Sequence, residues 1–321
     1  MLYPMTFKPI LKKIIWGGSD ICPFKGITPV QEGIGESWEL SHVEGNYSVV
    51  DNGALEGKTL DELIRTYGKQ LLGEKVVEQF GSIFPLLIKF IDARDNLSIQ
   101  VHPDDELAKK RHNSFGKTEM WYVVDCDEGA TLLYGFKHEI TKEEFARRIA
   151  DNTLLEVTNA VPVKKGDVFF IKSGTLHAIG KGILIAEIQQ NSNTTYRIYD
   201  YGRVGKDGKP RELHVNKALD VTKLAPAEQY PETPVEKKDG YDIKLLSKCE
   251  YFTTYRVNVE TKAELDADEN SFNSILVLEG EPVISGGETV SAKKGESVFI
   301  SAGTGKYTVE GKCTFVLTKI D

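Results

Sequence analysis

No uninterrupted apolar run in the sequence approaches the roughly 20 residues that a helix needs to cross a bilayer. The N-terminus also lacks the continuous apolar segment and the small-residue cleavage site of a secretory signal, because lysines interrupt its apolar residues. We therefore expect a cytoplasmic protein that has no membrane partner.

Blocks of lysine and arginine are absent as well, and the formal net charge is −8. A surface of this kind does not favour binding to the phosphate backbone of a nucleic acid, so we do not expect a nucleic-acid partner. The four cysteines are scattered and form no CxxC pair, which argues against a zinc ribbon or a redox couple. We interpret them as buried or incidental thiols: Cys22, Cys126, Cys249 and Cys313.

Short β-branched or aromatic runs between glycine turns are abundant, and they predict a mainly β protein built as an antiparallel barrel or sandwich. These runs are LSIQVH, EMWYVV, GDVFFIKSG, ILIAEIQ, TYRIYDY, SILVLEG and ESVFIS. Helices are fewer. One is predicted from Thr59, where Thr59 and Glu62 fit a capping box, and a second from Thr141. A short third helix is expected directly after His102, with Pro103 as its first residue.

A proline-rich and charged stretch between residues 224 and 239 predicts a linker. It separates an expected catalytic domain, residues 1–223, from a C-terminal β domain, residues 240–321. The segment GDVFFIKSGTLHAI, from Gly166, can be laid without gaps over GESVFISAGTGKYT, from Gly295, which suggests an internal duplication. In this overlay Lys306 takes the place of His177, so we expect the second domain to have no metal site.

Three segments place metal-binding side chains on a β scaffold. Side chains alternate along a strand, so Ser98, Gln100 and His102 share one face, and Lys117 and Glu119 share another. His177 follows a glycine turn at the end of a strongly apolar strand.

Each of these residues alone has an ordinary structural explanation. A histidine in a strand is usually structural, with its hydrogen bonds made within the protein, and Glu119 with Lys117 could be a solvent-exposed ion pair. Together Gln100, His102, Glu119 and His177 offer an amide oxygen, two imidazoles and a carboxylate. This donor set suits zinc or another borderline divalent ion. The spacing resembles the HxH…E…H pattern of cupins, with glutamine in place of the first histidine.

The sequence also resembles the type I phosphomannose isomerases, in their short bacterial form. The resemblance is carried by GESWELS, SIQVHPDD, GKTEMWYV, GTLHAIG and AEIQQNSNTTYRIYDYGR, and it spans the chain from about Trp16 to Arg203. It implies a cupin (jelly-roll) barrel with a few helices, followed by a second, smaller, degenerate cupin-like β domain. It further implies one Zn²⁺ per chain at Gln100, His102, Glu119 and His177, and interconversion of mannose 6-phosphate and fructose 6-phosphate through an enediol.

Lys117 and Arg197 match positions at the family's active site and are the expected cations beside a phosphorylated sugar. Glu187 interrupts the apolar run ILIAEIQ, so it is a candidate for proton transfer or the partner in a buried ion pair. Ser98 is a further candidate for substrate binding. The chain is expected to be a monomer or a weak homo-oligomer. Another metal cupin enzyme and a sugar-binding regulatory cupin without turnover remain as alternatives.

Overall fold

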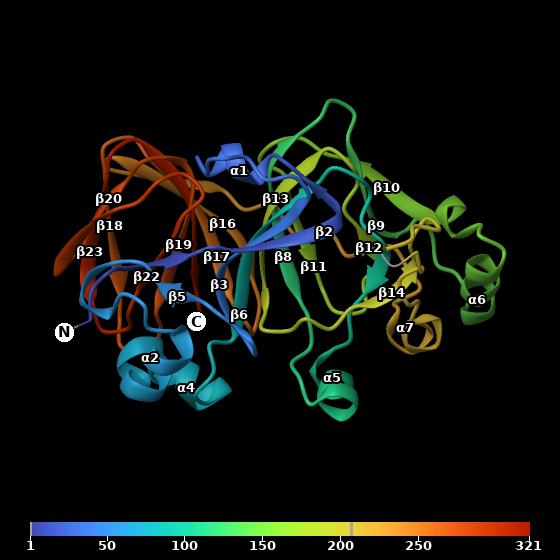
Figure 1. Cartoon of the computed structure of the whole chain (residues 1–321), viewed down its shortest axis with the longest axis horizontal. Coiled ribbons are helices and arrows are strands. Elements are labelled where there is room, and N and C mark those ends of the chain that lie inside the picture. The colour runs from blue at the N-terminus through green and yellow to red at the C-terminus, as the bar shows by residue number, and fades with distance from the viewer. Residues whose placement is uncertain (1, 206–207) are drawn as a thin grey trace.

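The computed structural model describes residues 2–205 and 208–321. Two β barrels lie side by side, and the helices are placed around their outside (Figure 1). The predicted mainly β, cupin-type fold is confirmed, and all seven predicted strand runs contain strands. Among the described residues, none of the helices has the length and apolarity to span a membrane.

The first barrel is formed by two facing sheets. A seven-stranded sheet has the order β11-β8-β13-β6-β2-β3-β4, and a five-stranded sheet has the order β10-β9-β12-β7-β14. The strands are β2 (Ile10–Gly18), β3 (Ile34–Val43), β4 (Asn46–Tyr47), β6 (Leu86–Ala93), β7 (Ile99–Val101), β8 (Glu119–Cys126), β9 (Thr131–Phe136), β10 (Thr158–Pro162), β11 (Val168–Ile171), β12 (His177–Ala178), β13 (Ile183–Gln190) and β14 (Tyr196–Tyr199).

The second barrel combines an eight-stranded sheet, β15-β16-β17-β24-β19-β22-β1-β5, with a four-stranded sheet, β18-β23-β20-β21. Its strands are β15 (Val235–Lys238), β16 (Tyr241–Lys248), β17 (Thr253–Val259), β18 (Lys262–Ala267), β19 (Asn273–Gly280), β20 (Val283–Gly286), β21 (Glu288–Ser291), β22 (Ser297–Ile300), β23 (Gly305–Glu310) and β24 (Cys313–Lys319), with β1 (Met5–Lys8) and β5 (Val49–Val50) from the N-terminal part of the chain.

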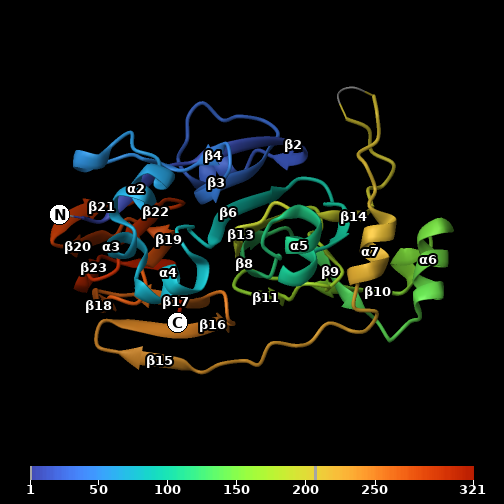
Figure 2. The same ribbon diagram turned by 90° about the horizontal axis from the view of Figure 1, so that it is seen from below.

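The sheet pairings differ from the expected domain boundary in two places. The N-terminal strand β1 pairs with β22, Met5 opposite Phe299, so the first residues of the chain belong to the second barrel's sheet. The expected linker crosses between the barrels as an extended segment (Figure 2), but its last part forms edge strand β15. One large apolar core, which includes Phe84, Phe90 and Phe299, joins the two barrels. We keep residues 224–239 as the proposed connection between two structural units.

The three predicted helices are present, and one of them begins later than predicted. Helix α2 (Leu60–Tyr67) has the complete Thr59–Glu62 capping box, and α6 (Lys142–Ala150) is capped by Thr141. Helix α5 (Asp105–His112) begins later than predicted, because the Asp104 side chain accepts the Leu107 N–H and acts as the N-cap, so Pro103 lies outside the helix. The other helices are α1 (Ile21–Phe24), α3 (Lys69–Leu72), α4 (Glu74–Phe80), α7 (Val215–Val221) and the 3₁₀ turns η1 (Gly53–Leu55) and η2 (Leu154–Glu156).

Candidate active site

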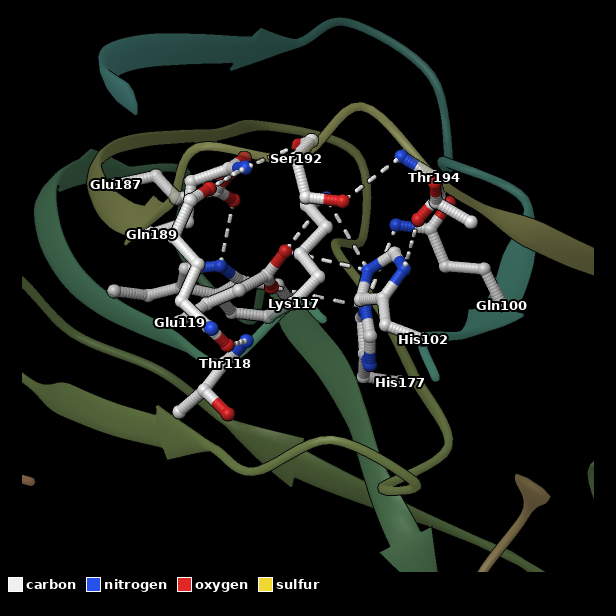
Figure 3. Close-up of polar contacts among 12 residues, drawn as sticks. Gln100, His102, Lys117, Thr118, Glu119, His177, Glu187, Gln189, Ser192 and Thr194 are labelled. Atoms are coloured by element: carbon white, nitrogen blue, oxygen red, sulfur yellow. Dashed lines mark hydrogen bonds and ion pairs between the residues drawn. The ribbon is translucent and has the colours of Figure 1, made fainter. Parts of the chain in front are cut away.

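The candidate metal ligands meet between the two sheets of the first barrel. His177 on β12 lies opposite Gln100 on β7, and Gln100 lies opposite Arg197 on β14. Directly paired residues of antiparallel strands point to the same face, so these three side chains form one row across the five-stranded sheet. Glu119 approaches from β8 on the facing sheet. Figure 3 shows this convergence of imidazoles and carboxylates.

The turn before His177 is fixed by the backbone. Gly174 adopts φ +83°, and a Cβ there would lie 2.8 Å from the carbonyl oxygen of Val221. The Gly174 N–H donates to the His102 carbonyl oxygen at 2.9 Å. This bond connects the two histidine-bearing segments directly.

Both histidines have one ring nitrogen committed to the backbone. His102 Nδ1 donates to the carbonyl oxygen of Thr194 at 2.9 Å, and His177 Nδ1 donates to that of Thr175 at 2.8 Å. A carbonyl oxygen can only accept, so both Nδ1 atoms carry the proton and both Nε2 atoms bear a lone pair. Burial lowers the pKa of His177 and, with Lys117, lowers that of His102 to about 3, which keeps the rings neutral.

Glu119 completes a buried group of three ligand atoms. His102, Glu119 and His177 are all buried, and their ligand atoms lie within 4.8 Å of one another. Neither oxygen of Glu119 accepts a hydrogen bond of good geometry from the described residues. Burial opposes ionisation of Glu119, but the positive charge of Lys117 outweighs that cost and holds the pKa of Glu119 well below its usual value.

The donors fit a cation. The ammonium group of Lys117 lies 2.7 Å from Glu119 Oε1 and 3.3 Å from His102 Nε2, so a positive charge already lies next to two of them. A buried carboxylate and two imidazole nitrogens, with ligand atoms within 4.8 Å of one another, can therefore hold a divalent metal. Gln100 presents its amide Nε2, and not its oxygen, to His177 Nε2 at 3.3 Å.

The remaining predicted residues lie around this cluster. Glu187 is buried, and Trp121 Nε1 donates to its Oε2 at 2.7 Å. Arg197 Nη1 donates to the carbonyl oxygen of Glu212 at 2.8 Å, whereas its Nε is buried without a partner in the described part of the chain. Ser98 is buried, with Oγ 3.5 Å from Gln100 Oε1.

Sequence reasoning missed Lys89. This buried lysine on β6 lies 3.0 Å from Glu187 Oε1 and 3.5 Å from Glu36 Oε2. The signal was present, because a lysine inside the apolar strand LLIKFIDA demands a partner just as Glu187 does. Burial is the main cause that raises the pKa of Glu187, and the negative charge of Glu119 raises it further. The positive charge of Lys89 opposes this rise but does not cancel it.

Comparison with known proteins identifies the family of this chain. Residues 5–130 match the model of the phosphomannose isomerase type I catalytic domain, and residues 242–320 match that of the mannose-6-phosphate isomerase cupin domain. The chain is 39% identical to mannose-6-phosphate isomerase ManA of Bacillus subtilis over 319 residues, 99% of each chain.

Solved structures give the same result. The crystal structure of the mannose 6-phosphate isomerase from Bacillus subtilis superposes with a TM-score of 0.91, at 35% identity and 99% coverage of both chains. The apo form of the enzyme from Salmonella typhimurium, at 17% identity, shares the fold with a TM-score of 0.79. With the family models and this full-length identity, the chain belongs to the type I mannose-6-phosphate isomerases.

Proposed function

We propose that this chain interconverts mannose 6-phosphate and fructose 6-phosphate through an enediol, with one zinc ion held by His102, Glu119 and His177 and by Gln100 as fourth ligand. The observation that carries the proposal is the buried group of His102, Glu119 and His177, whose ligand atoms lie within 4.8 Å of one another. Arg197, on the same sheet as His177, has an Nε without a partner among the described residues. For Gln100 to bind through oxygen, its amide has to turn over.

Zinc bound there would act as a Lewis acid and stabilise negative charge on substrate oxygen. One carboxylate against a divalent ion leaves the site with a formal charge of +1, because the two histidines and the glutamine are neutral. The donor set thus retains the electrophilic character of the ion.

The isomerisation moves a proton between C2 and C1 of the open-chain sugar. Glu187 is the proposed residue for this transfer, because it is a buried carboxylate whose pKa is raised by burial and whose two oxygens are held by Lys89 and Trp121. Lys117 and Arg197 are the proposed cations for the substrate, and Ser98 is a proposed hydroxyl contact. Lys117 is buried beside Glu119, Ser98 is buried near Gln100, and the half-buried Arg197 pairs with Gln100 in the sheet, which supports these roles.

The test is a coupled assay that follows fructose 6-phosphate formed from mannose 6-phosphate by chelated and zinc-reloaded protein. We expect loss of activity on chelation and recovery with zinc. Full turnover by a preparation shown to be metal-free would contradict the metal-dependent mechanism. Tight zinc and sugar binding without turnover would indicate a regulatory binding protein instead. We also propose a cytoplasmic monomer or weak homo-oligomer, because a charged sugar phosphate does not cross a bilayer unaided.

A further inference from the structure

Strands β17 to β24 of the second barrel repeat, in order, strands β6 to β13 of the first. In the first, β11 pairs with β8, β8 with β13, and β13 with β6. In the second, β22 pairs with β19, β19 with β24, and β24 with β17. The facing sheets correspond as well, since β12 joins β7 to β9 and β23 joins β18 to β20. The predicted duplication is therefore present in the topology.

The register then identifies equivalent positions. Ile171 of β11 lies opposite Glu119, and its overlay partner Ile300 of β22 lies opposite Asn273. Asn273 therefore occupies the position of Glu119 in the second barrel. Its buried side chain confirms that it faces inward.

The next inward positions follow along the same ladders. Trp121 pairs with Glu187, which pairs with Lys89. In the second barrel Ile275 pairs with Leu317, and Leu317 lies on β24 beside Tyr255 of β17. The ion pair Lys89–Glu187 of the first barrel is thus replaced by Tyr255 and Leu317.

The gapless overlay was wrong about His177. Lys306 is exposed, and the buried residue that points into the second barrel is Tyr307. A shift of one residue moves a strand's side chains to the other face, so Tyr307 and not Lys306 occupies the inward position. Over residues 2–205 and 208–321, His102, Glu119 and His177 form the only group of three or more His, Cys, Asp or Glu side chains close enough to hold a metal.

A cavity of about 480 Å³ opens at this equivalent place, which is a usual size for a small-ligand site. Its walls include the equivalents Tyr255, Asn273 and Leu317. Further apolar surface comes from Tyr241, Ile243 and Leu265. The second barrel has therefore kept an open pocket where the first has its catalytic centre, and has exchanged charged groups for aromatic, aliphatic and amide ones.

Polar groups in the cavity are arranged for a neutral ligand. Asn273 Nδ2 donates to the Asp266 carbonyl oxygen at 2.8 Å and to Tyr307 Oη at 2.9 Å. Both amide hydrogens are then used, which fixes the amide and leaves its oxygen as an acceptor.

The charged side chains of the lining balance one another, two lysines against two carboxylates, and the lysines are paired. Lys238 lies 3.0 Å from Glu236, and Lys319 lies 2.7 Å from Asp321. A phosphate group, which carries up to about two negative charges at neutral pH, finds no unpaired lysine in this lining.

We propose that this cavity, the second-barrel pocket, binds a neutral hexose in its ring form. Such a sugar has an apolar C–H face that packs against the rings of Tyr241 and Tyr255, and hydroxyl groups that donate to the Asn273 amide oxygen. The proposal does not depend on the isomerase function, because it involves no residue of the first barrel.

The probe is methyl α-mannoside, whose blocked anomeric carbon prevents ring opening and therefore isomerisation. Binding is measured by saturation-transfer NMR and calorimetry on the full chain. We expect Tyr255→Ala to weaken binding by about tenfold, and Tyr255→Phe, which keeps the ring, to retain it within about twofold. Arg197→Ala, in the first barrel, should bind the probe as the wild type does.

Isomerase activity of the Tyr255 variants reports whether the chain is folded, since Tyr255 is remote from the first barrel's site. Absence of binding by the folded wild-type chain overturns the proposal. Binding that survives Tyr255→Ala but is displaced by mannose 6-phosphate also overturns it, because the probe would then occupy the first barrel. Tighter binding of mannose 6-phosphate than of the neutral sugar at the Tyr255-dependent site would overturn the assignment to neutral ligands.

Discussion

Lys89 and Glu187 form a buried ion pair across two adjacent strands, with Lys89 Nζ 3.0 Å from Glu187 Oε1. They are direct partners in the register of β6 and β13. The only other polar contact of the Glu187 carboxylate among the described residues is the Trp121 indole N–H. Lys89 thus fixes the orientation of the proposed proton-transfer group and lowers the cost of its charge.

We predict that Lys89→Met lowers kcat by roughly tenfold to a hundredfold, less than the 10²–10⁴ that a general base itself contributes. Lys89 lowers the pKa of Glu187, so its removal raises that pKa further. A base must be deprotonated to act, and the acidic limb of the kcat profile should therefore move to higher pH. Lys110→Met, an exposed lysine on α5, is the matched control. A lower kcat with an unmoved acidic limb would assign Lys89 a purely structural role.

Arg197→Ala should lower kcat/KM for mannose 6-phosphate by roughly a hundredfold, because one charge-assisted donor to the substrate is lost. Zinc content should stay at the wild-type level. Although Arg197 lies beside Gln100 in the sheet, its hydrogen bond goes to the Glu212 carbonyl oxygen and, among the described residues, not to a proposed metal ligand. Arg197→Lys should recover part of the activity. Loss of zinc in Arg197→Ala would make the residue structural.

His177→Ala should lose most of the bound zinc, because one of the two imidazole donors is removed. The wild-type chain is expected to contain one zinc per chain by elemental analysis. His112→Ala is the control, because this ring contacts Tyr196 Oη at 2.8 Å, outside the ligand group. Two zinc ions per wild-type chain, with one retained in His177→Ala, would reveal a second metal site.

Strand alternation alone places Gln100 and His102 on one face. The structure brings His102 together with Glu119 and His177, and Gln100 lies 3.3 Å from His177. Partners across the sheet were not predictable in the same way. Lys89 meets Glu187 only through the register of β6 and β13, which depends on turns and bulges elsewhere in the sheet. The same limitation produced the error at Lys306, since a shift of one residue exchanges the two faces of a strand.

The domain boundary shows another limit. Composition predicts a connection after residue 224, but nothing in the segment MTFK indicates that it pairs with β22, far along the chain. A strand of only four residues, such as β1, depends on tertiary packing more than on its own residues. The N-terminal part is joined to the second barrel elsewhere too, through Lys25 and Glu39.

Lys25 Nζ lies 2.7 Å from Glu39 and also contacts the carbonyl oxygen of Gly295, on the turn before β22. The side chains of the pair are only 3% and 1% exposed. Burial raises the pKa of Glu39, and Lys25 opposes this rise. Lys25→Met therefore leaves a buried carboxylate without its counter-ion, and we predict destabilisation by about 3–5 kcal/mol at neutral pH.

The pH dependence follows from the sign of that shift. A carboxyl whose pKa is higher in the folded state contributes stability at low pH, and this contribution is lost as pH rises through the folded-state pKa. In Lys25→Met the pKa of Glu39 in the folded state rises further. The loss in free energy of unfolding relative to wild type, measured by urea unfolding, should therefore grow from acidic to neutral pH. The double variant Lys25→Met/Glu39→Leu should recover most of the loss, because no unpaired charge remains. A deficit that is independent of pH, and that the double variant does not relieve, would show that Lys25 acts through its contact with Gly295 instead of through Glu39.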